Sequence, residues 1–271
     1  MVRGPAHYRS KGVCIYCGAA GIPLKDEHVV PYSLGGTHVL RDASCAACED
    51  ITKNFEQQVA RDLWGDARTS FDQPTRRKKE RRTHIEVPGA NERGGKRLIP
   101  AGEYPAGFIF YKMGPSGFLR GLSDTTDISG SWQMLVIDDE KRRTNFMENH
   151  GPPVIAFRHV PEAFGKLLAK IAYCQVLTAL DPGDFRPLVL PYIIGEKTNL
   201  SYIVGSKDGV PEPGDGYRLT TRIGEHAGRI ILMAEVRLYA NTHAPTYEIL
   251  VGDASGPEET ARICRKLAQP A

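Results

Sequence analysis

One segment of the chain carries apolar residues at helical spacing. In PEAFGKLLAKIAYCQVLTAL (161–180), apolar side chains recur every three or four positions, after a proline suited to the first turn of a helix. The apolar stripe comprises Phe164, Leu167, Leu168, Ile171, Cys174 and Leu177. The pattern predicts a core helix and a buried thiol at Cys174. Two further helices are predicted, from about Ala46 to Trp64 and from Pro257 to Leu267.

Short apolar or alternating runs in the second part of the chain predict strands. They are GFIFYKM (107–113), SWQMLVID (131–138), PVIAFRHV (153–160), PLVLPYIIG (187–195), SYIVGS (201–206), GRIILMAEVRLYA (228–240) and TYEILVG (246–252). Residues 72–103 instead combine Pro, Gly and charge with little periodicity. We therefore expect an α+β fold in three parts: a small module over 1–72, a basic linker over 73–95, and a larger mixed α+β domain over 96–271.

The composition is that of a globular chain, with 41% hydrophobic and 25% charged residues. No apolar run approaches the roughly 18 residues that a membrane span needs. The first twelve residues, MVRGPAHYRSKG, lack the apolar core of a secretion signal. The expected location is the cytoplasm, without a membrane partner.

Positive charge is concentrated in one run. The net charge of the chain is only +3, but TRRKKERR (75–82) holds six positive residues and one negative one. Such a run is either a solvated linker or a nucleic-acid contact. The candidate contacts are Arg76, Arg77, Lys78, Lys79, Arg81 and Arg82. Residues 96–271 are nearly neutral, which argues against that domain as the main phosphate-binding surface.

Four of the six cysteines form two C-x2-C pairs, separated by 27 residues: Cys14 and Cys17, then Cys45 and Cys48. In a reducing compartment such pairs are more often metal ligands than disulfides. Zinc takes four thiolates in tetrahedral geometry, and each pair supplies two of them. The alternative, a redox dithiol, usually occurs once, at the start of a helix. The two cysteine pairs, together called the cysteine frame, therefore predict one structural zinc ion.

The segment DEHVVPYSLGG (26–36) lies between the two pairs. The order CIYC (14–17), EHVVP (27–31), LGG (34–36) and CAAC (45–48) resembles the HNH endonucleases, whose ββα-metal module is often held by zinc through two C-x2-C pairs. The resemblance covers about residues 11–64. It implies a hydrolase that cleaves phosphodiester bonds in nucleic acid, with double-stranded DNA as the expected partner and Mg²⁺ or another divalent ion as catalytic metal.

The resemblance also implies site residues. His28 takes the place of the general base, a role that suits a neutral histidine near pH 7. Glu27 takes that of an acidic metal ligand. Neighbouring side chains on a strand point to opposite faces, so these two share a site only if the strand ends or bends there. Family members often place an Asn before the second cysteine pair to orient the base; here Asp42 is the nearest polar candidate.

The helix expected after Cys48 would place Glu49, Thr52 and Glu56 on one face. Glu49 and Glu56 are therefore further candidate metal ligands, in place of the usual nitrogen or amide group. His38 is a weaker candidate. Two other functions stay open: a zinc-knuckle module that binds nucleic acid or protein without cutting and, less favoured, a thiol oxidoreductase. No motif assigns a role to residues 96–271.

Overall fold

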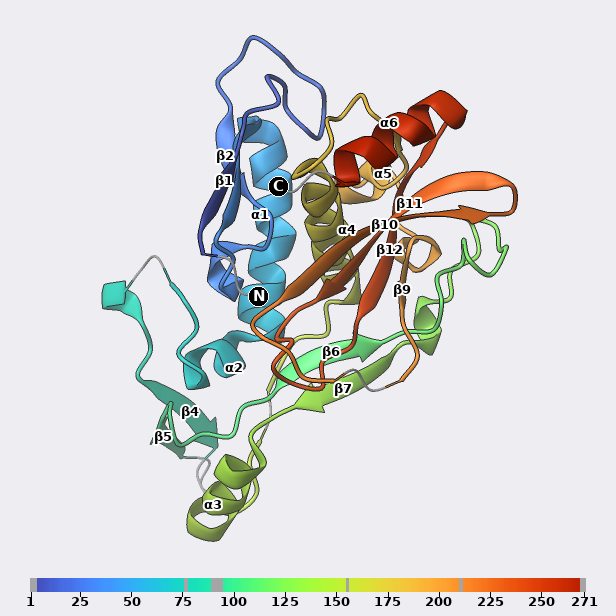
Figure 1. The fold of residues 1–271 in the computed structure, drawn as a ribbon. Helices are drawn as coiled ribbons and strands as arrows, with labels where there is room; N and C mark the ends of the chain where they lie inside the picture. The colour runs from blue at the N-terminus through green and yellow to red at the C-terminus, as the bar shows by residue number, and fades with distance from the viewer. Residues whose placement is uncertain (1–3, 76–77, 89–94, 155, 210–211, 269–271) are drawn as a thin grey trace.

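The computed structural model describes residues 4–75, 78–88, 95–154, 156–209 and 212–268 (Figure 1). It has the expected α+β fold: an N-terminal sheet with the four-cysteine cluster, followed by a larger α+β region. Within the described segments, no helix has the length and apolar character needed to cross a membrane.

The N-terminal sheet has three strands in the order β1-β3-β2. Strand β1 (Ala6–Tyr8) pairs in parallel with β3 (His38–Ser44), and β2 (Lys25–His28) pairs with β3 in antiparallel register. The short 3-10 helix η1 (Tyr32–Leu34) lies between β2 and β3. Helix α1 (Ala46–Gln57) follows directly after β3, which completes a ββα unit.

The helix predicted from Ala46 to Trp64 is confirmed over nearly its whole length. Helix α1 continues as a π-helical segment, η2 (Gln58–Leu63), and α2 (Gly65–Ser70) follows. Trp64, at the junction, is fully buried, and its indole Nε1 donates to the Ile109 carbonyl at 2.6 Å. Its ring contacts Phe108, Phe110, Phe164 and Tyr239. The end of this helical segment is thus anchored in the core of the larger region.

Helix α4 (Pro161–Leu177) lies at the centre of the molecule, with the N-terminal sheet and α1 on one side and the C-terminal sheet on the other (Figure 1). The predicted core helix and the buried thiol of Cys174 are both confirmed. The C-terminal sheet is antiparallel, in the order β10-β11-β12-β8, with β9 also paired to β12. Its strands are β8 (Arg186–Pro187), β9 (Val204–Ser206), β10 (Arg218–His226), β11 (Arg229–Arg237) and β12 (Tyr247–Ala254).

Two hairpins and several helices complete the described fold. The hairpins pair β4 (His84–Pro88) with β5 (Lys96–Pro100) and β6 (Phe108–Lys112) with β7 (Gln133–Ile137). The remaining helices are η3 (Lys78–Glu80), η4 (Ser129–Ser131), α3 (Glu140–His150), α5 (Leu190–Ile193), η5 (Leu200–Tyr202) and α6 (Pro257–Ala268). The predicted terminal helix is confirmed as α6.

Three of the predicted strands are wrong in whole or in part. The described residues of 153–160 form no strand. The segment 187–195 leaves the sheet after Pro187 and forms α5, with Pro191 in its first turn, where a missing N–H costs nothing. The segment 201–206 begins as the end of η5, and only Val204–Ser206 is strand. Short apolar runs do not separate a buried strand from a buried helical turn.

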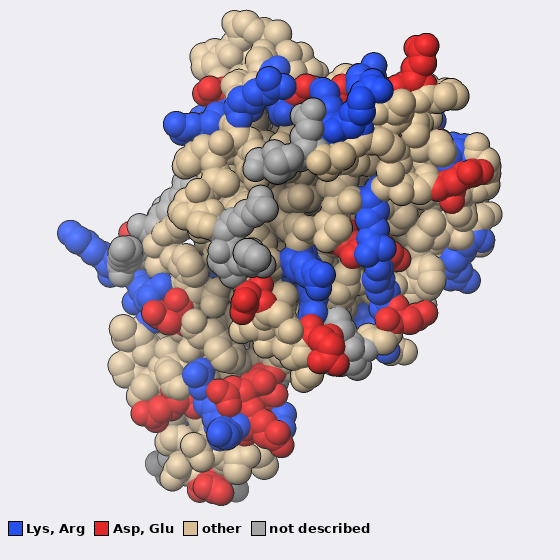
Figure 2. All heavy atoms as spheres, in the orientation of Figure 1, with Lys and Arg blue, Asp and Glu red and all other residues tan. Residues whose placement is uncertain are grey.

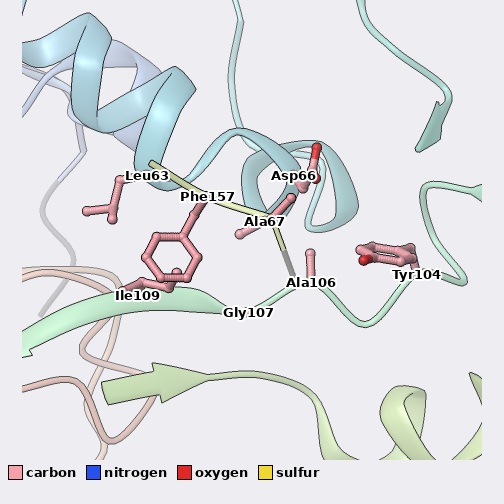
Figure 3. Close-up of a pocket in the computed structure, with 9 residues that line it drawn as sticks. Leu63, Asp66, Ala67, Tyr104, Ala106, Gly107, Ile109 and Phe157 are labelled. Carbon is pink, nitrogen blue, oxygen red and sulfur yellow. The ribbon is translucent and has the colours of Figure 1, made fainter. Parts of the chain in front are cut away.

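A small cavity lies where η2 and α2 meet β6 (Figure 3). Its volume is about 10 Å³, and Leu63, Ala67, Ile109 and Phe157 are among the residues around it. A cavity of this size is near the lower limit for a single water molecule. The junction between the two regions is therefore packed core and offers no room for a ligand here.

Candidate functional site

The four cysteines of the two C-x2-C pairs form one cluster, as predicted. Cys14 and Cys17 lie in a tight turn closed by a hydrogen bond from the Gly18 N–H to the Cys14 carbonyl, 2.8 Å, with Gly18 at a φ of 74°. Cys45 is the N-cap of α1, and Cys48 lies in its first turn. The turn and the helix start thus bring all four sulfurs within 4.8 Å of one another.

The cluster fits a structural zinc ion. Four thiolates held about 2.3 Å from zinc in a tetrahedron lie about 3.8 Å apart, and the Cys17 and Cys45 sulfurs are 3.8 Å apart. The Cys45 N–H donates to the Cys14 sulfur at 3.4 Å. Burial opposes ionisation of Cys14, but this and other backbone N–H groups outweigh it and lower its pKa to about 7, whereas burial and the neighbouring thiols raise the pKa of Cys48. The fit to zinc therefore rests on the set of four sulfurs and their spacing.

A cleft of about 380 Å³ opens beside the cluster, between the end of β2 and the helical segment α1–η2. It brings together four of the predicted site residues: Glu27, His28, Glu49 and Glu56. Glu27 and His28 are sequence neighbours, yet both line the cleft, because β2 ends at His28 and the chain turns there. The His28 ring lies next to the Tyr32 ring, with centroids 6.0 Å apart.

The sequence did not single out Lys170 of α4, which joins this site from the larger region. Its ammonium Nζ lies 2.8 Å from Glu27 Oε1 and 2.9 Å from Glu56 Oε1, and it also donates to the His28 carbonyl. The lysine side chain is completely buried. Burial disfavours its charge, but the carboxylates of Glu27 and Glu56 outweigh that cost and raise the pKa of Lys170 above its ordinary value. Lys170 therefore forms a buried ion-pair cluster with both carboxylates inside the site.

One signal could have revealed this lysine. Lys170 follows Leu167 by three residues and precedes Cys174 by four, so it lies on the apolar stripe of the predicted helix. A charged residue on a buried stripe requires a partner of opposite charge. The partners themselves, far away in the sequence, are visible only in the tertiary structure.

The presence of Lys170 bears on the predicted catalytic metal. A divalent ion such as Mg²⁺ is bound through unpaired carboxylate oxygens. Glu27 and Glu56, the two most buried carboxylates of the cleft, instead share the Lys170 ammonium. Glu49 forms an ion pair with Lys25 at the edge of the cleft. As they stand, Glu27 and Glu56 do not fit a divalent metal site.

Two predicted site residues lie outside the cleft lining. Asp42 lies in β3, next to the irregularity in the β2–β3 pairing, and its backbone φ is 43°. Its N–H donates a hydrogen bond to Asp26 Oδ1 at 3.1 Å. The structure therefore does not bring Asp42 beside His28. The His38 ring shares a hydrogen bond of 2.9 Å with the Tyr8 hydroxyl. It lines a separate cavity of about 760 Å³.

Within the basic run, Arg76 and Arg77 lie outside the described residues, and Lys78 and Lys79 belong to η3. Arg81 and Arg82 form ion pairs with Asp72 and Asp66. Both arginines line a hollow of about 390 Å³ that shares Arg61, Arg68, Ala60 and Thr75 with the cleft. A groove with arginine side chains therefore runs from the cleft to the basic run.

The surface charge is mixed on one face of the molecule (Figure 2). Figure 2 shows positive and negative side chains interspersed over the face drawn there. Ion pairs such as Lys207–Glu235 at 2.5 Å and Arg143–Asp138 at 2.8 Å belong to this pattern. This mixture agrees with the near-neutral balance of residues 96–271.

No family model matches the chain, and searches of curated proteins and of solved structures find no match either. The resemblance to the HNH endonucleases therefore stays a prediction, based on the order of four short motifs.

Proposed function

We propose that this chain is an HNH-type endonuclease that hydrolyses phosphodiester bonds in nucleic acid, with double-stranded DNA as the expected substrate. The four cysteines bind a structural zinc ion that holds the ββα unit together. The observation that carries the proposal is the cleft beside this cluster, in which His28 lies at the end of β2 opposite α1.

In this proposal His28 acts as the general base. A water oxygen attacks phosphorus, a proton of that water passes to the His28 ring, and the bond from phosphorus to the leaving oxygen breaks. The leaving oxygen takes a proton from solvent. The groove that contains Arg61, Arg81 and Arg82 supports binding of the phosphate backbone.

A catalytic metal would supply positive charge to the departing oxygen. In this chain such an ion would need ligands other than Glu27 and Glu56, which pair with Lys170. The same ion pairs favour the second candidate function, a zinc-knuckle module that binds nucleic acid without cutting it. Cleavage assays with a histidine variant distinguish the two.

The test compares plasmid cleavage by wild type, His28→Ala and the matched control His38→Ala, with Mg²⁺ or Mn²⁺ present. Loss of a general base should slow cleavage by roughly a hundredfold or more in His28→Ala. His38→Ala, altered in the separate cavity, should cleave at close to the wild-type rate. Zinc content, melting temperature and DNA affinity should stay near wild type in both variants.

Two outcomes would contradict the proposal. Equal cleavage by wild type and His28→Ala would exclude His28 as the base. If the wild-type protein binds DNA but cleaves none of the substrates tested, the zinc-knuckle binder is favoured.

A further inference from the structure

Three oxygen atoms surround the Lys170 ammonium. It forms ion pairs with Glu27 Oε1 at 2.8 Å and with Glu56 Oε1 at 2.9 Å, and it donates a hydrogen bond to the His28 carbonyl. The oxygen atoms come from β2 and α1, whereas the lysine comes from α4. One side chain of the larger region thus connects both elements that carry the cleft.

The charge balance explains why the lysine is needed. Glu27 is 7% exposed, and a buried carboxylate without a counter-charge is strongly unfavourable. Two such carboxylates close together repel each other unless a cation lies between them. In a metal-dependent site that cation is the metal ion. Here the Lys170 ammonium lies between the two carboxylates.

We infer that Lys170 is a positioning residue of the cleft: its ammonium is a built-in cation that holds Glu27, Glu56 and the His28 main chain, and it occupies the position in which these carboxylates would otherwise bind a divalent metal. The completely buried ammonium does not touch substrate. It acts through His28, whose carbonyl it anchors at the point where β2 ends. This inference deepens the proposed function, but its metal-binding consequence holds whether or not the chain cleaves nucleic acid.

The first test measures Mn²⁺ binding to the zinc-loaded full chain, without substrate, by electron paramagnetic resonance. Wild type and the double variant Glu27→Gln/Glu56→Gln should bind the same amount of Mn²⁺, because the ammonium already neutralises the carboxylates. A wild-type Mn²⁺ site that disappears in the double variant would overturn the inference. This comparison requires no substitution of Lys170.

The second test removes the ammonium. The Lys170→Met substitution keeps an unbranched side chain of similar length but removes its charge. The variant protein should gain one bound Mn²⁺ per polypeptide. Mn²⁺ should also raise its melting temperature while leaving that of wild type unchanged. Adding Glu27→Gln and Glu56→Gln to Lys170→Met should abolish the new site. A merely structural lysine would not produce this exchange of one cation for another.

The matched control is Lys166→Met on the same helix. Lys166 pairs with Glu162 at 2.6 Å, an acidic residue one turn away on α4. This variant should bind no additional Mn²⁺. A folded Lys170→Met protein that gains no Mn²⁺ would overturn the inference, as would an equal gain in Lys166→Met. Failure of the proposed nuclease function would instead appear as absent cleavage with these Mn²⁺ results intact.

Discussion

Gly35 and Gly36, adjacent in the turn that follows η1, are glycines for different reasons. Gly35 has a φ of 86°, and there is open space where a Cβ would lie. A Cβ on Gly36 would lie 1.8 Å from the Val30 carbonyl oxygen, although the φ of Gly36 is unexceptional. This close approach brings the chain back alongside the segment that follows His28. The double glycine of the motif thus combines a left-handed turn with a steric requirement.

Gly36→Ala should therefore destabilise the protein more than Gly35→Ala. We expect a loss of about 3 kcal/mol or more in the free energy of unfolding for Gly36→Ala, because backbone must move to admit the methyl group. Gly35→Ala should cost about 1–2 kcal/mol, the penalty for a left-handed residue with a side chain. Urea denaturation measures both. Gly102→Ala is the neutral control, because a Cβ added at Gly102 meets no atom within 4 Å outside its chain neighbours. Equal losses at the two positions would contradict the steric argument.

At the scale of elements, one carboxylate joins three segments. Asp181, in the loop after α4, accepts hydrogen bonds from Lys11 of the N-terminal segment and Lys266 of α6, each at 2.9 Å. The bonds from these two ammonium groups lower the pKa of Asp181 to about 2. An aspartate in an unfolded chain has a pKa of about 3.9. The folded state therefore gains stability from the ionised carboxylate above about pH 4 and loses it as the pH falls toward 2.

The corresponding prediction concerns Asp181→Asn. Because the carboxylate is 36% exposed, solvent screening reduces its contribution, and we expect a loss of about 1 kcal/mol at pH 7. The difference in melting temperature between wild type and variant should shrink steadily as the pH is lowered from 5 to 3. Asp72→Asn is the control, since Asp72 is 79% exposed in its pair with Arg81. A difference that is independent of pH would show that the lost contact is not ionic.

At the scale of the whole molecule, the cysteine cluster and the larger region share one core. The Tyr173 hydroxyl of α4 donates to the Ile15 carbonyl at 2.8 Å, within the turn that carries Cys14 and Cys17. The Tyr16 and Tyr173 rings lie 6.2 Å apart, and both are buried. Any loss of order at the cluster therefore reaches the central helix directly.

Removal of zinc should accordingly affect the whole protein. Binding of a structural metal contributes directly to folding free energy, so a chelator or Cys45→Ser should lower the melting temperature by at least about 10 °C. Differential scanning calorimetry should record one transition for the zinc-loaded chain. Cys264→Ser, an exposed cysteine of α6 outside the cluster, should retain zinc and melt as wild type does. An unchanged melting temperature after complete zinc removal would exclude a structural role for the metal.

The features that the sequence predicted well are those with local causes. The spacing of each cysteine pair matches the reach of one turn, and the second pair begins a helix, so the cluster follows from short-range geometry. The large apolar residues at helical spacing identify α4, although elements pack on both sides of this helix and bury most of its faces. Helix α3 was missed because its sequence is mostly polar and Phe146 is its single buried residue. The exposed strand β10 has no clear apolar alternation either.

The sequence by itself determined the cysteine frame, the central helix and the presence of Glu27, His28 and Glu56 close to that frame. Only the tertiary structure decided what those carboxylates do, because Lys170 lies 142 residues from the His28 carbonyl to which it donates. In the sequence, this lysine is a polar interruption of an apolar stripe. A charge can remain in a protein interior only where the fold supplies opposite charges around it. No local pattern of residues specifies which distant carboxylates those will be.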